Sequence, residues 1–209
     1  MIAIIDYGVG NLFSLRSSFA MIGAETVVTG DPEIIRGAER IVLPGVGAFG
    51  DAAEKLREAG LAAVIKERAA AGTPLLGICL GMQLLFDRSY EFGEFEGLGL
   101  IPGEIRPIAD RIPAGLKIPH IGWNALHMTA APSPILKDLS DGDCVYFVHS
   151  FSAVSCDPYV SATTGYGAEL TAAVRRGNVY GCQFHPEKSG KIGLKILRAF
   201  CDTEVSALC

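Results

Sequence analysis

The sequence has no apolar run of the ~18 residues that a membrane-spanning helix needs, although 49% of its residues are hydrophobic. It has no excess of basic residues either. The formal net charge is -5, which leaves no overall positive field to attract the phosphates of nucleic acid or anionic lipid. With 20% charged residues, the composition also excludes a disordered or fibrous chain. We therefore expect a globular protein with no nucleic-acid and no membrane partner.

The cysteines include no Cys-x-x-Cys pair, so neither a zinc ribbon nor a thioredoxin-type redox site is indicated. They lie at positions 79, 144, 156, 182, 201 and 209. The first residues, 1–6, lack the basic segment of a secretory signal peptide. We expect a cytoplasmic protein with free thiols, buried by default, and a disordered Cys209 at the terminus.

The first half of the chain alternates short apolar runs with helical patterns, which is typical of βα units that build a parallel sheet. Strands are expected at 2–7, 25–28, 40–43 and 74–78, and helices at 12–22, 48–71 and 81–86. The second half is richer in strand-like runs, at 103–107, 117–126, 144–151, 159–163, 172–176 and 179–184. A last helix is expected at 189–200, with Ser189 as its N-cap and Ile192, Ile196 and Phe200 on one face. The pattern predicts one α/β domain over residues 1–209.

Cys79 stands between two glycines in Gly77-Ile78-Cys79-Leu80-Gly81, where an expected strand turns into an expected helix. A nucleophile in a sharp strand-to-helix turn needs such glycines, and the positive end of the helix favours the thiolate over the thiol. Cysteine is also a common core residue, and glycines serve close packing. The segment alone leaves both interpretations open.

His185 and Glu187, beyond the last expected strand, could supply the base and the orienting carboxylate that a cysteine nucleophile requires. His-x-Glu is short enough to occur by chance, and Cys182 with His185 could be two ligands of a metal site. No second ligand pair lies at zinc-like spacing, so we expect no metal.

Two glycine-rich loops follow the early strands. Pro44-Gly45-Val46-Gly47 could turn its N–H groups toward an oxyanion, with Leu80 as a second donor, or could be an ordinary turn. Gly8-x-Gly10 is part of a dinucleotide-binding pattern, but Phe13 stands at the position of the third glycine, so we expect no cofactor.

The segments 77–83 (GICLGMQ) and 185–187 (HPE), taken in this order, resemble the class I (triad) glutamine amidotransferases. Within that family, five segments together resemble the glutaminase subunit of imidazole glycerol phosphate synthase. They are 6–11 (DYGVGN), 44–47 (PGVG), 119–124 (PHIGWN), 146–151 (YFVHSF) and 185–189 (HPEKS). The resemblance covers nearly the whole chain. It implies a flavodoxin-like three-layer sandwich with a central mixed, mostly parallel sheet.

The resemblance also implies roles for individual residues. Cys79 would attack the carboxamide of glutamine, with His185 as base and Glu187 as orienter. The oxyanion hole would be formed by Val46, Gly47 and Leu80, and relatives without a ligand can show it unformed. Glutamine would be bound by Gly47, Gln83, Glu91, His149, Ser150 and Phe151. Contacts with a partner subunit would come from His120, Trp123, Asn124 and Lys188.

The implied partner is a (β/α)8-barrel cyclase subunit, which would form a heterodimer with this chain and use its ammonia. The products would be imidazole glycerol phosphate and an aminoimidazole carboxamide ribotide, in histidine biosynthesis. We expect 209 residues to suffice for glutamine hydrolysis but not for the second reaction. From the residues alone, Trp123 could be a core residue and Lys188 a solvated one. Alternatives are the glutaminase of anthranilate, aminodeoxychorismate, carbamoyl phosphate or pyridoxal phosphate synthesis, or a non-catalytic binding protein on the same fold.

Overall fold

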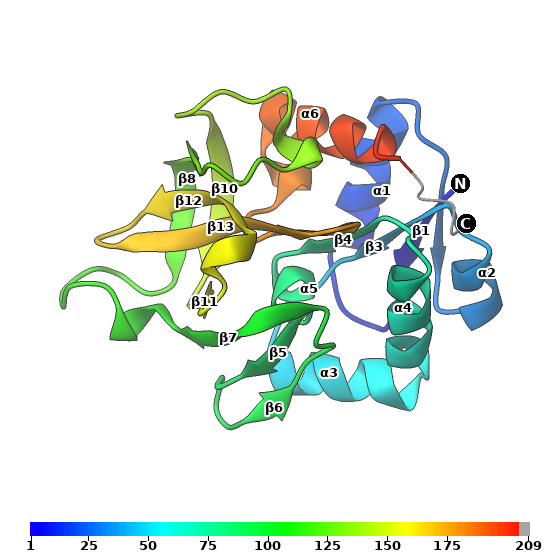
Figure 1. Cartoon of the computed structure of the whole chain (residues 1–209), viewed down its shortest axis with the longest axis horizontal. Helices are drawn as coiled ribbons and strands as arrows, with labels where there is room; N and C mark the ends of the chain where they lie inside the picture. Colours follow the sequence, from blue (N-terminus) through cyan, green and yellow to red (C-terminus); the bar gives the residue numbers. More distant parts are fainter. Residues whose placement is uncertain (205–209) are drawn as a thin grey trace.

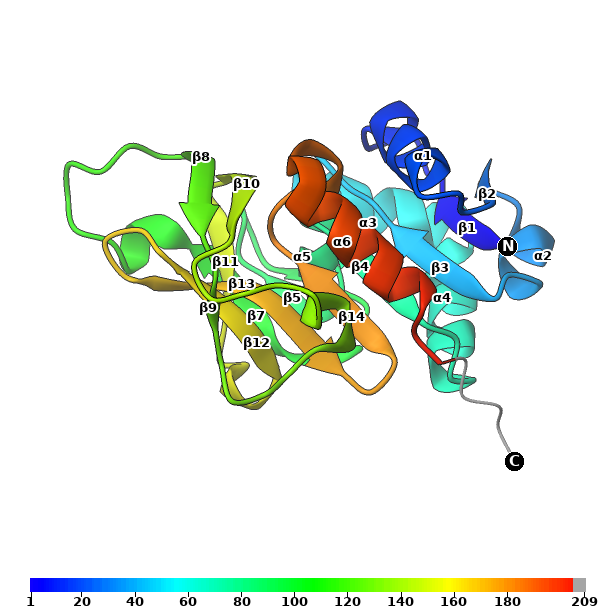
Figure 2. The ribbon, with the colours of Figure 1, turned by 90° about the horizontal axis from the view of Figure 1, so that it is seen from above.

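An eight-stranded sheet runs through the molecule in the order β2-β1-β3-β4-β14-β13-β12-β9 (Figures 1 and 2). The computed structural model describes residues 1–204, so Cys209 lies outside the described residues. The strands of this sheet are β1 (Ile2–Ile5), β2 (Thr26–Thr29), β3 (Arg40–Leu43), β4 (Leu75–Ile78), β9 (His127–Met128), β12 (Val160–Gly165), β13 (Glu169–Arg176) and β14 (Val179–Cys182). From β2 to β14 all neighbours pair in parallel, whereas β13, β12 and β9 continue antiparallel.

Helices cover both faces of the sheet and produce three layers (Figure 1). They are α1 (Leu12–Met21), α2 (Pro32–Arg36), α3 (Phe49–Glu58), α4 (Leu61–Ala70), the short α5 (Leu80–Gln83) and α6 (Gly190–Cys201). In β1, Ile2 and Ile4 join the apolar cluster under α1 and α6, while Ala3 and Ile5 join the cluster under α2, α3 and α4. Burial on both faces explains why the parallel strands are continuous apolar runs rather than alternating ones.

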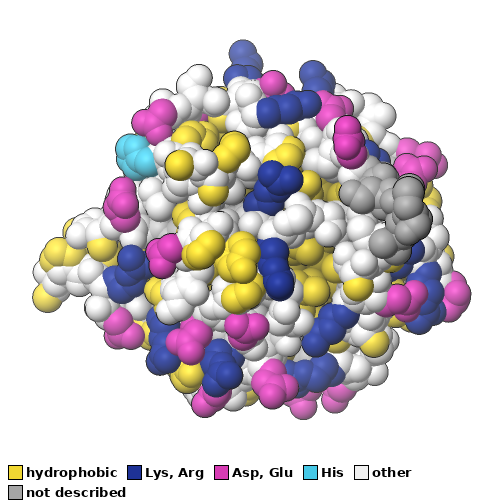
Figure 3. Space-filling model, in the orientation of Figure 1, with side chains coloured by type: hydrophobic (Ala, Val, Ile, Leu, Met, Phe, Trp, Pro, Cys, Tyr) yellow, Lys and Arg dark blue, Asp and Glu magenta, His cyan; other side chains and the backbone are white. Residues whose placement is uncertain are grey.

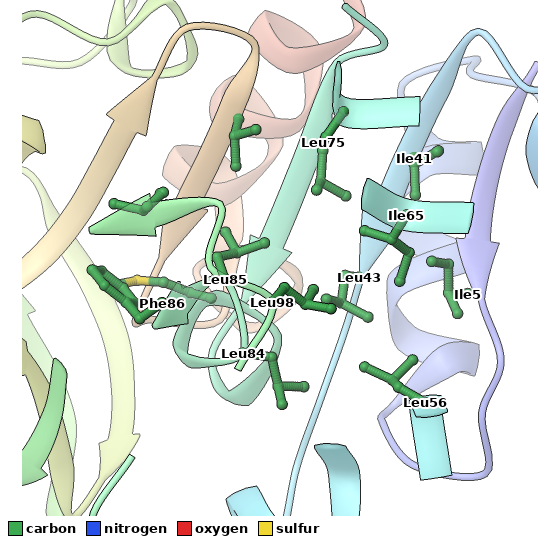
Figure 4. Close-up of a cluster of buried hydrophobic side chains, with 14 of the residues drawn as sticks. Ile5, Ile41, Leu43, Leu56, Ile65, Leu75, Leu84, Leu85, Phe86 and Leu98 are labelled. Atoms are coloured by element: carbon green, nitrogen blue, oxygen red, sulfur yellow. The ribbon is translucent and has the colours of Figure 1, made fainter. Parts of the chain in front are cut away.

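The single long helix predicted at 48–71 is wrong, because the chain forms α3 and α4 instead. Gly60 separates them in the left-handed conformation, with φ +69°, which glycine adopts without steric cost. The break lets both helices pack on the sheet, where Leu56 and Ile65 join Ile5 and Leu43 in one cluster (Figure 4). In a single straight helix Leu56 and Ile65, nine residues apart, would lie on opposite faces, so one of them would point away from the core.

Two smaller sheets flank the central one and were only partly anticipated. One pairs β8 (His120–Ala125) with β10 (Cys144–His149), and the other has the order β11-β7-β5-β6. Its strands are β5 (Phe86–Ser89), β6 (Phe95–Glu96), β7 (Ile101–Pro107) and β11 (Phe151–Val154). The strand predicted at 144–151 is therefore two strands in different sheets, and the helix predicted at 81–86 ends at Gln83 before β5 begins. The chain turns between the two sheets at Ser150.

The last helix, α6, confirms the predicted apolar face, since Ile196 and Phe200 are buried and Ile192 packs beside them. Ser189 occupies the N-cap position, but its side chain makes no capping hydrogen bond. Its hydroxyl instead donates to the carbonyl of His185 at 2.6 Å and accepts the N–H of Tyr146 at 3.0 Å. Ser189 thus ties the segment that carries His185 to β10.

The surface carries both signs of charge. On the face shown in Figure 3, acidic and basic side chains are interspersed rather than gathered in one field. Within residues 1–204, no helix combines the length and the apolar character needed to cross a membrane. The described cysteines are all free thiols; Cys79, Cys156 and Cys182 are buried, but Cys144 is exposed, contrary to the expected burial.

Candidate active site

Three loops meet at one edge of the sheet because β3, β4 and β14 are neighbours and run in the same direction. The loop 44–47 follows β3, Cys79 follows β4, and His185 with Glu187 follows β14. Ligands of open α/β sheets bind at the carboxyl ends of the strands. Residues more than 100 positions apart in the sequence are thereby brought to one place.

Cys79 has an unusual backbone conformation, with φ +54° and ψ -113°. The glycines around it are required sterically, as predicted. A Cβ on Gly77 would lie 2.7 Å from the carbonyl oxygen of Gly81, and a Cβ on Gly81 would overlap the carbonyl oxygen of Leu43. The strand can turn so sharply only because both positions lack a side chain. The turn places Cys79 directly before the first residue of α5.

His185 and Glu187 form a buried pair, with 2.8 Å between Nδ1 and Oε1 and side chains only 3% and 4% exposed. Since a carboxylate only accepts, this contact fixes the proton on Nδ1 and leaves Nε2 free to act; Nε2 has no partner within residues 1–204. Burial alone would lower the pKa of His185, but its interactions with Cys79 and Glu187 raise it to about 9. The imidazole is thus suited to hold a proton taken from the thiol.

The Cys79 sulfur lies among polar groups. Sγ is 3.9 Å from the Val148 carbonyl oxygen and 3.8 Å from Nε2 of Gln183. The Gln183 amide is fully buried, and its Oε1 accepts from Nε2 of Gln83 at 3.0 Å. We did not anticipate Gln183 from the sequence. The available signal was its position two residues before His185, which puts both side chains on the same side of an extended segment.

The loop 44–47 packs against this turn. The Tyr7 hydroxyl donates to the Pro44 carbonyl at 2.8 Å, and a Cβ on Gly45 would lie 2.8 Å from the Gly81 nitrogen. Burial, followed by the nearby Cys79, raises the pKa of Tyr7, so its proton stays on the hydroxyl. Gly47 has φ +97° and Val46 is 41% exposed. The predicted oxyanion segment is therefore buried at Pro44 and Gly45 and exposed at Val46 and Gly47.

A cavity of about 600 Å³ joins these groups. All of the residues predicted for catalysis, for the oxyanion hole or for glutamine binding line it, except the orienter Glu187. They are Val46, Gly47, Cys79, Leu80, Gln83, Glu91, His149, Ser150, Phe151 and His185. The volume suits a small metabolite.

Glu91 is the acidic group of the cavity wall. Its Oε2 accepts the N–H of Phe49 at 2.8 Å, at the amino end of α3, where a negative charge is favourable. Burial raises the pKa of Glu91, the N–H of Phe49 opposes this, and Asp51 adds to the rise. A cationic ligand group would offset the free-energy cost of burying this charged carboxylate.

The residues predicted to face a partner lie in different environments. Trp123 is 58% exposed and Lys188 is exposed, with its Nζ 5.8 Å from the ring centroid of Tyr146. Asn124 is half-buried, and His120 is buried at 3% exposure. Side chains alternate along a strand, so Ile121 and Trp123 face outward while His120 points into the protein.

Within residues 1–204, no group of three or more His, Cys, Asp or Glu side chains is placed to hold a metal ion. A second hollow, of about 690 Å³, lies beside β11, β12 and β13. Two of its polar side chains bond to the backbone: Arg111 donates to the carbonyl of Glu169, and Thr171 to that of Ala153.

A nucleophilic thiol, a paired base and a glycine loop at the carboxyl ends of parallel strands define a triad enzyme of acyl transfer. Residues 3–203 match the family model described as "Glutamine amidotransferase class-I". Two solved structures share the fold. The first is a glutamine amidotransferase, with a TM-score of 0.74 and 18% identity, and the match covers 97% of this chain and 98% of that one. The second is PurLQS from Thermotoga maritima, with a TM-score of 0.73 and 23% identity, and the match covers 96% of this chain and 97% of that one. These likenesses confirm the predicted three-layer fold.

The sequence is also similar over its length to curated bacterial proteins named imidazole glycerol phosphate synthase subunit HisH. It is 52% identical to that of Lactococcus lactis subsp. lactis, over 96% of this chain and 98% of the relative. It is 50% identical to that of Sulfurimonas denitrificans, over 96% of this chain and 97% of the relative. It is also 50% identical to that of Lacticaseibacillus casei, over 100% of this chain and 99% of the relative. The chain therefore belongs to the class I glutamine amidotransferases and, within them, to the family of HisH subunits.

Proposed function

We propose that this chain is the glutaminase subunit of an imidazole glycerol phosphate synthase and that it hydrolyses glutamine to glutamate and ammonia through a thioester on Cys79. The observation that carries the proposal is the combination of Cys79 in a strained turn with the buried His185–Glu187 pair, with Cys79 and His185 both lining one cavity of about 600 Å³. A cavity of that size admits an amino acid of the size of glutamine.

In the first half of the reaction, Nε2 of His185 takes the thiol proton of Cys79, and the sulfur attacks the carboxamide carbon of glutamine. Glu187 holds the imidazole by its Nδ1–H and stabilises the imidazolium that forms. The pKa of about 9 for His185 means that the imidazole keeps this proton at neutral pH. The N–H of Leu80 and the segment of Val46 and Gly47 stabilise the oxyanion of the tetrahedral intermediate.

In the second half, the intermediate collapses and the carbon–nitrogen bond breaks. His185 donates its proton to the leaving nitrogen, so that ammonia departs and a γ-glutamyl thioester remains on Cys79. Water, deprotonated by the same imidazole, then attacks the thioester carbon. The carbon–sulfur bond breaks, and the imidazolium returns the proton to the sulfur, giving glutamate and the free thiol. Atoms balance, and no cofactor is needed.

The amino-acid end of glutamine is held on the other wall of the cavity. Glu91 accepts its α-ammonium, which supplies the positive charge that the desolvated carboxylate lacks. Gly47 and Gln83, together with His149, Ser150 and Phe151, contact the remainder of the substrate. These polar groups around a mostly apolar pocket fix the orientation of the carboxamide at Cys79.

The ammonia passes to a (β/α)8-barrel cyclase subunit in a cytoplasmic heterodimer, with this chain contributing one glutaminase domain. Trp123, Asn124 and Lys188 form the partner face. Exposed Trp123 supports this assignment, because aromatic residues are enriched at interface cores. The neighbouring exposed Ile121 enlarges the apolar patch.

The experiment measures glutamate release by the purified chain alone, with a barrel cyclase, and with the cyclase and its nucleotide ligand. We expect low activity alone and strong stimulation by the liganded cyclase. Activity that survives Cys79→Ala contradicts the thioester. Failure of histidine-pathway cyclases to bind or stimulate the chain contradicts the pathway and leaves the chemistry standing.

A further inference from the structure

A chain of hydrogen bonds through two buried imidazoles leads from β8 to the cavity. Nδ2 of Asn124 lies 3.3 Å from Nε2 of His120, Nδ1 of His120 lies 3.0 Å from Nε2 of His149, and Nδ1 of His149 lies 2.8 Å from the Phe151 carbonyl oxygen. Both imidazoles are at most 5% exposed. We call His120 and His149 the imidazole pair.

The partners at the two ends determine where the protons lie. A carbonyl oxygen only accepts, so Nδ1 of His149 carries hydrogen, and a neutral His149 must then accept at Nε2 from Nδ1–H of His120. His120 in turn accepts at Nε2 from Asn124. The orientation of the Asn124 amide agrees, because Nδ2 also donates to the carbonyl of Gly165 and Oδ1 accepts from the N–H of Ala125. Every donor in the chain points toward the cavity.

The imidazole pair is neutral, as this pattern requires. Burial lowers the pKa of His120, and burial together with the neighbouring His120 and His185 lowers that of His149 to about 4, against the opposing effect of the Phe151 carbonyl. A proton on both nitrogens of either ring would set two N–H groups against each other.

The chain ends at the point where the backbone passes from one small sheet to another. His149 is the last residue of β10 and pairs with His120, whereas Phe151 begins β11. The Phe151 carbonyl also accepts from Nε2 of Gln83 at 3.3 Å. The corner 148–151 therefore carries the Val148 carbonyl next to the sulfur of Cys79 and the Phe151 carbonyl next to Gln83.

The ring of His120 has aromatic neighbours, which an apolar ring could contact as well. His120 is stacked between Phe147 and Tyr166, with centroid separations of 5.0 and 4.2 Å. Packing alone thus gives no reason for a polar group there, and a buried polar group costs free energy unless it is hydrogen-bonded. The hydrogen bonds to Asn124 and His149 are what distinguish histidine from phenylalanine at this position.

We propose that His120 is a positioning residue of the glutamine site: it donates to His149 and thereby holds the corner 148–151 that lines the cavity, rather than contacting a partner subunit. The expected effect on kinetics rests on the proposed glutaminase function, whereas the arrangement of the imidazole pair does not. Asn124, which begins the chain, lies beside the exposed Trp123, so the partner face and the glutamine site share this connection.

The first test is the ¹⁵N spectrum of the imidazole rings in the full chain, labelled in its four histidines, at pH 7.5. We expect His120 and His149 both to carry hydrogen on Nδ1 and none on Nε2, with assignments made from single His→Asn variants. An Nε2–H signal from either ring would overturn the chain of donors. This spectrum needs neither glutamine nor a partner.

The second test is kinetic, in the complex with the barrel cyclase and its nucleotide ligand. His120→Phe keeps the stacked ring but removes the donor, and we expect the KM for glutamine to rise about five- to tenfold while kcat changes less than about twofold. His120→Asn keeps an N–H near the position of Nδ1 and should restore most of the loss. His127→Phe, at a half-exposed histidine outside the chain, is the matched control.

Equal effects of His120→Phe and His120→Asn, or a fall in kcat alone, would overturn the positioning role. If the wild-type complex hydrolyses no glutamine, the proposed function fails, whereas the ring spectrum still decides whether the imidazole pair is arranged as we infer. Circular dichroism of both variants separates loss of folding from loss of positioning.

Discussion

Cys79 combines a reactive side chain with a backbone conformation that few residues with a Cβ adopt. Its φ of +54° and ψ of -113° fall outside the common left-handed region, and such residues cost on the order of 1–3 kcal/mol each. The hydrogen bond from its N–H to the Cys182 carbonyl, at 2.8 Å, and the close packing of Gly77 and Gly81 hold it there. These contacts with the neighbouring strand and helix offset the conformational strain at Cys79.

At the same scale, Glu187 should matter less than the groups it supports. Glu187→Gln keeps an acceptor for Nδ1–H of His185 but removes the charge that helps to raise its pKa. We expect weak glutaminase activity to remain, clearly above that of Cys79→Ala, because an orienting residue contributes less than the nucleophile or base. Steady-state glutamate release by the three proteins, each with saturating cyclase, checks this. If Glu187→Gln were as inactive as Cys79→Ala, the orienting role would be wrong.

Two histidines should shape the pH dependence of stability in opposite directions. The pKa of His149 is lowered from 6.5 to about 4. Its contribution to the free energy of unfolding is therefore present above pH 6.5 and is lost as the pH falls through about 4. The pKa of His185 is raised to about 9, so its contribution is complete below pH 6.5 and is lost as the pH rises through about 9.

Urea unfolding between pH 4 and 10 measures both contributions. We expect His149→Phe to flatten the acid side of the stability profile and His185→Phe to flatten the alkaline side. An acid side that is equally steep in His149→Phe and in the wild-type protein would show that His149 is not neutral in the folded chain.

At the scale of elements, the fit between α5 and the end of β3 depends on a missing side chain. A methyl group on Gly81 would overlap the carbonyl oxygen of Leu43, which is backbone and cannot move aside cheaply. We expect Gly81→Ala to lower the free energy of unfolding by several kcal/mol and to abolish glutaminase activity. Gly165→Ala is the control, because a Cβ there meets nothing within 4 Å. Equal stability of the two variants in urea would contradict the close packing.

Much of the sheet could be predicted from the sequence, because strands buried on both faces are apolar runs whose ends are set by glycine, proline and charge. The strand at Arg40–Leu43 was predicted to the residue. The division of α3 from α4 at Gly60 could not be predicted from the pattern. Glycine within an apolar helical pattern only lowers the stability of a helix, and tertiary packing decides whether the helix breaks there. β6 and β9, with two residues each, are too short to show a period.

The site was predictable where its chemistry is local in sequence. Gly77, Cys79 and Gly81 share one turn, and His185 and Glu187 are two residues apart, so their patterns carry the geometry. The place of Gln183 beside the sulfur, and of His120 inside the protein rather than at its surface, depends on which strands pair. Alternation along β8 fixes that His120 and Trp123 face opposite ways, but it does not say which face is buried.

At the scale of the whole molecule, the exposed aromatic of β8 should contribute to association. Trp123 lies edge-on to Tyr146, with 6.2 Å between the ring centroids, and the residue is 58% exposed. We expect Trp123→Ala to weaken binding of the barrel cyclase by tenfold or more, the range typical of a buried aromatic anchor. Titration calorimetry measures this. Met21→Ala, at an apolar residue on α1 that is 72% exposed, should bind like the wild type; the same loss in both variants would argue against a specific partner face.

The central claim is that glutamine is hydrolysed through a covalent bond to Cys79. The most direct measurement quenches the complex of this chain with its cyclase in acid during turnover of glutamine and determines the mass of the intact chain and of its peptides. We predict a γ-glutamyl group on the peptide that contains Cys79, absent in Cys79→Ala and absent without glutamine. A glutamyl group on another residue, or turnover by Cys79→Ala, would contradict the account.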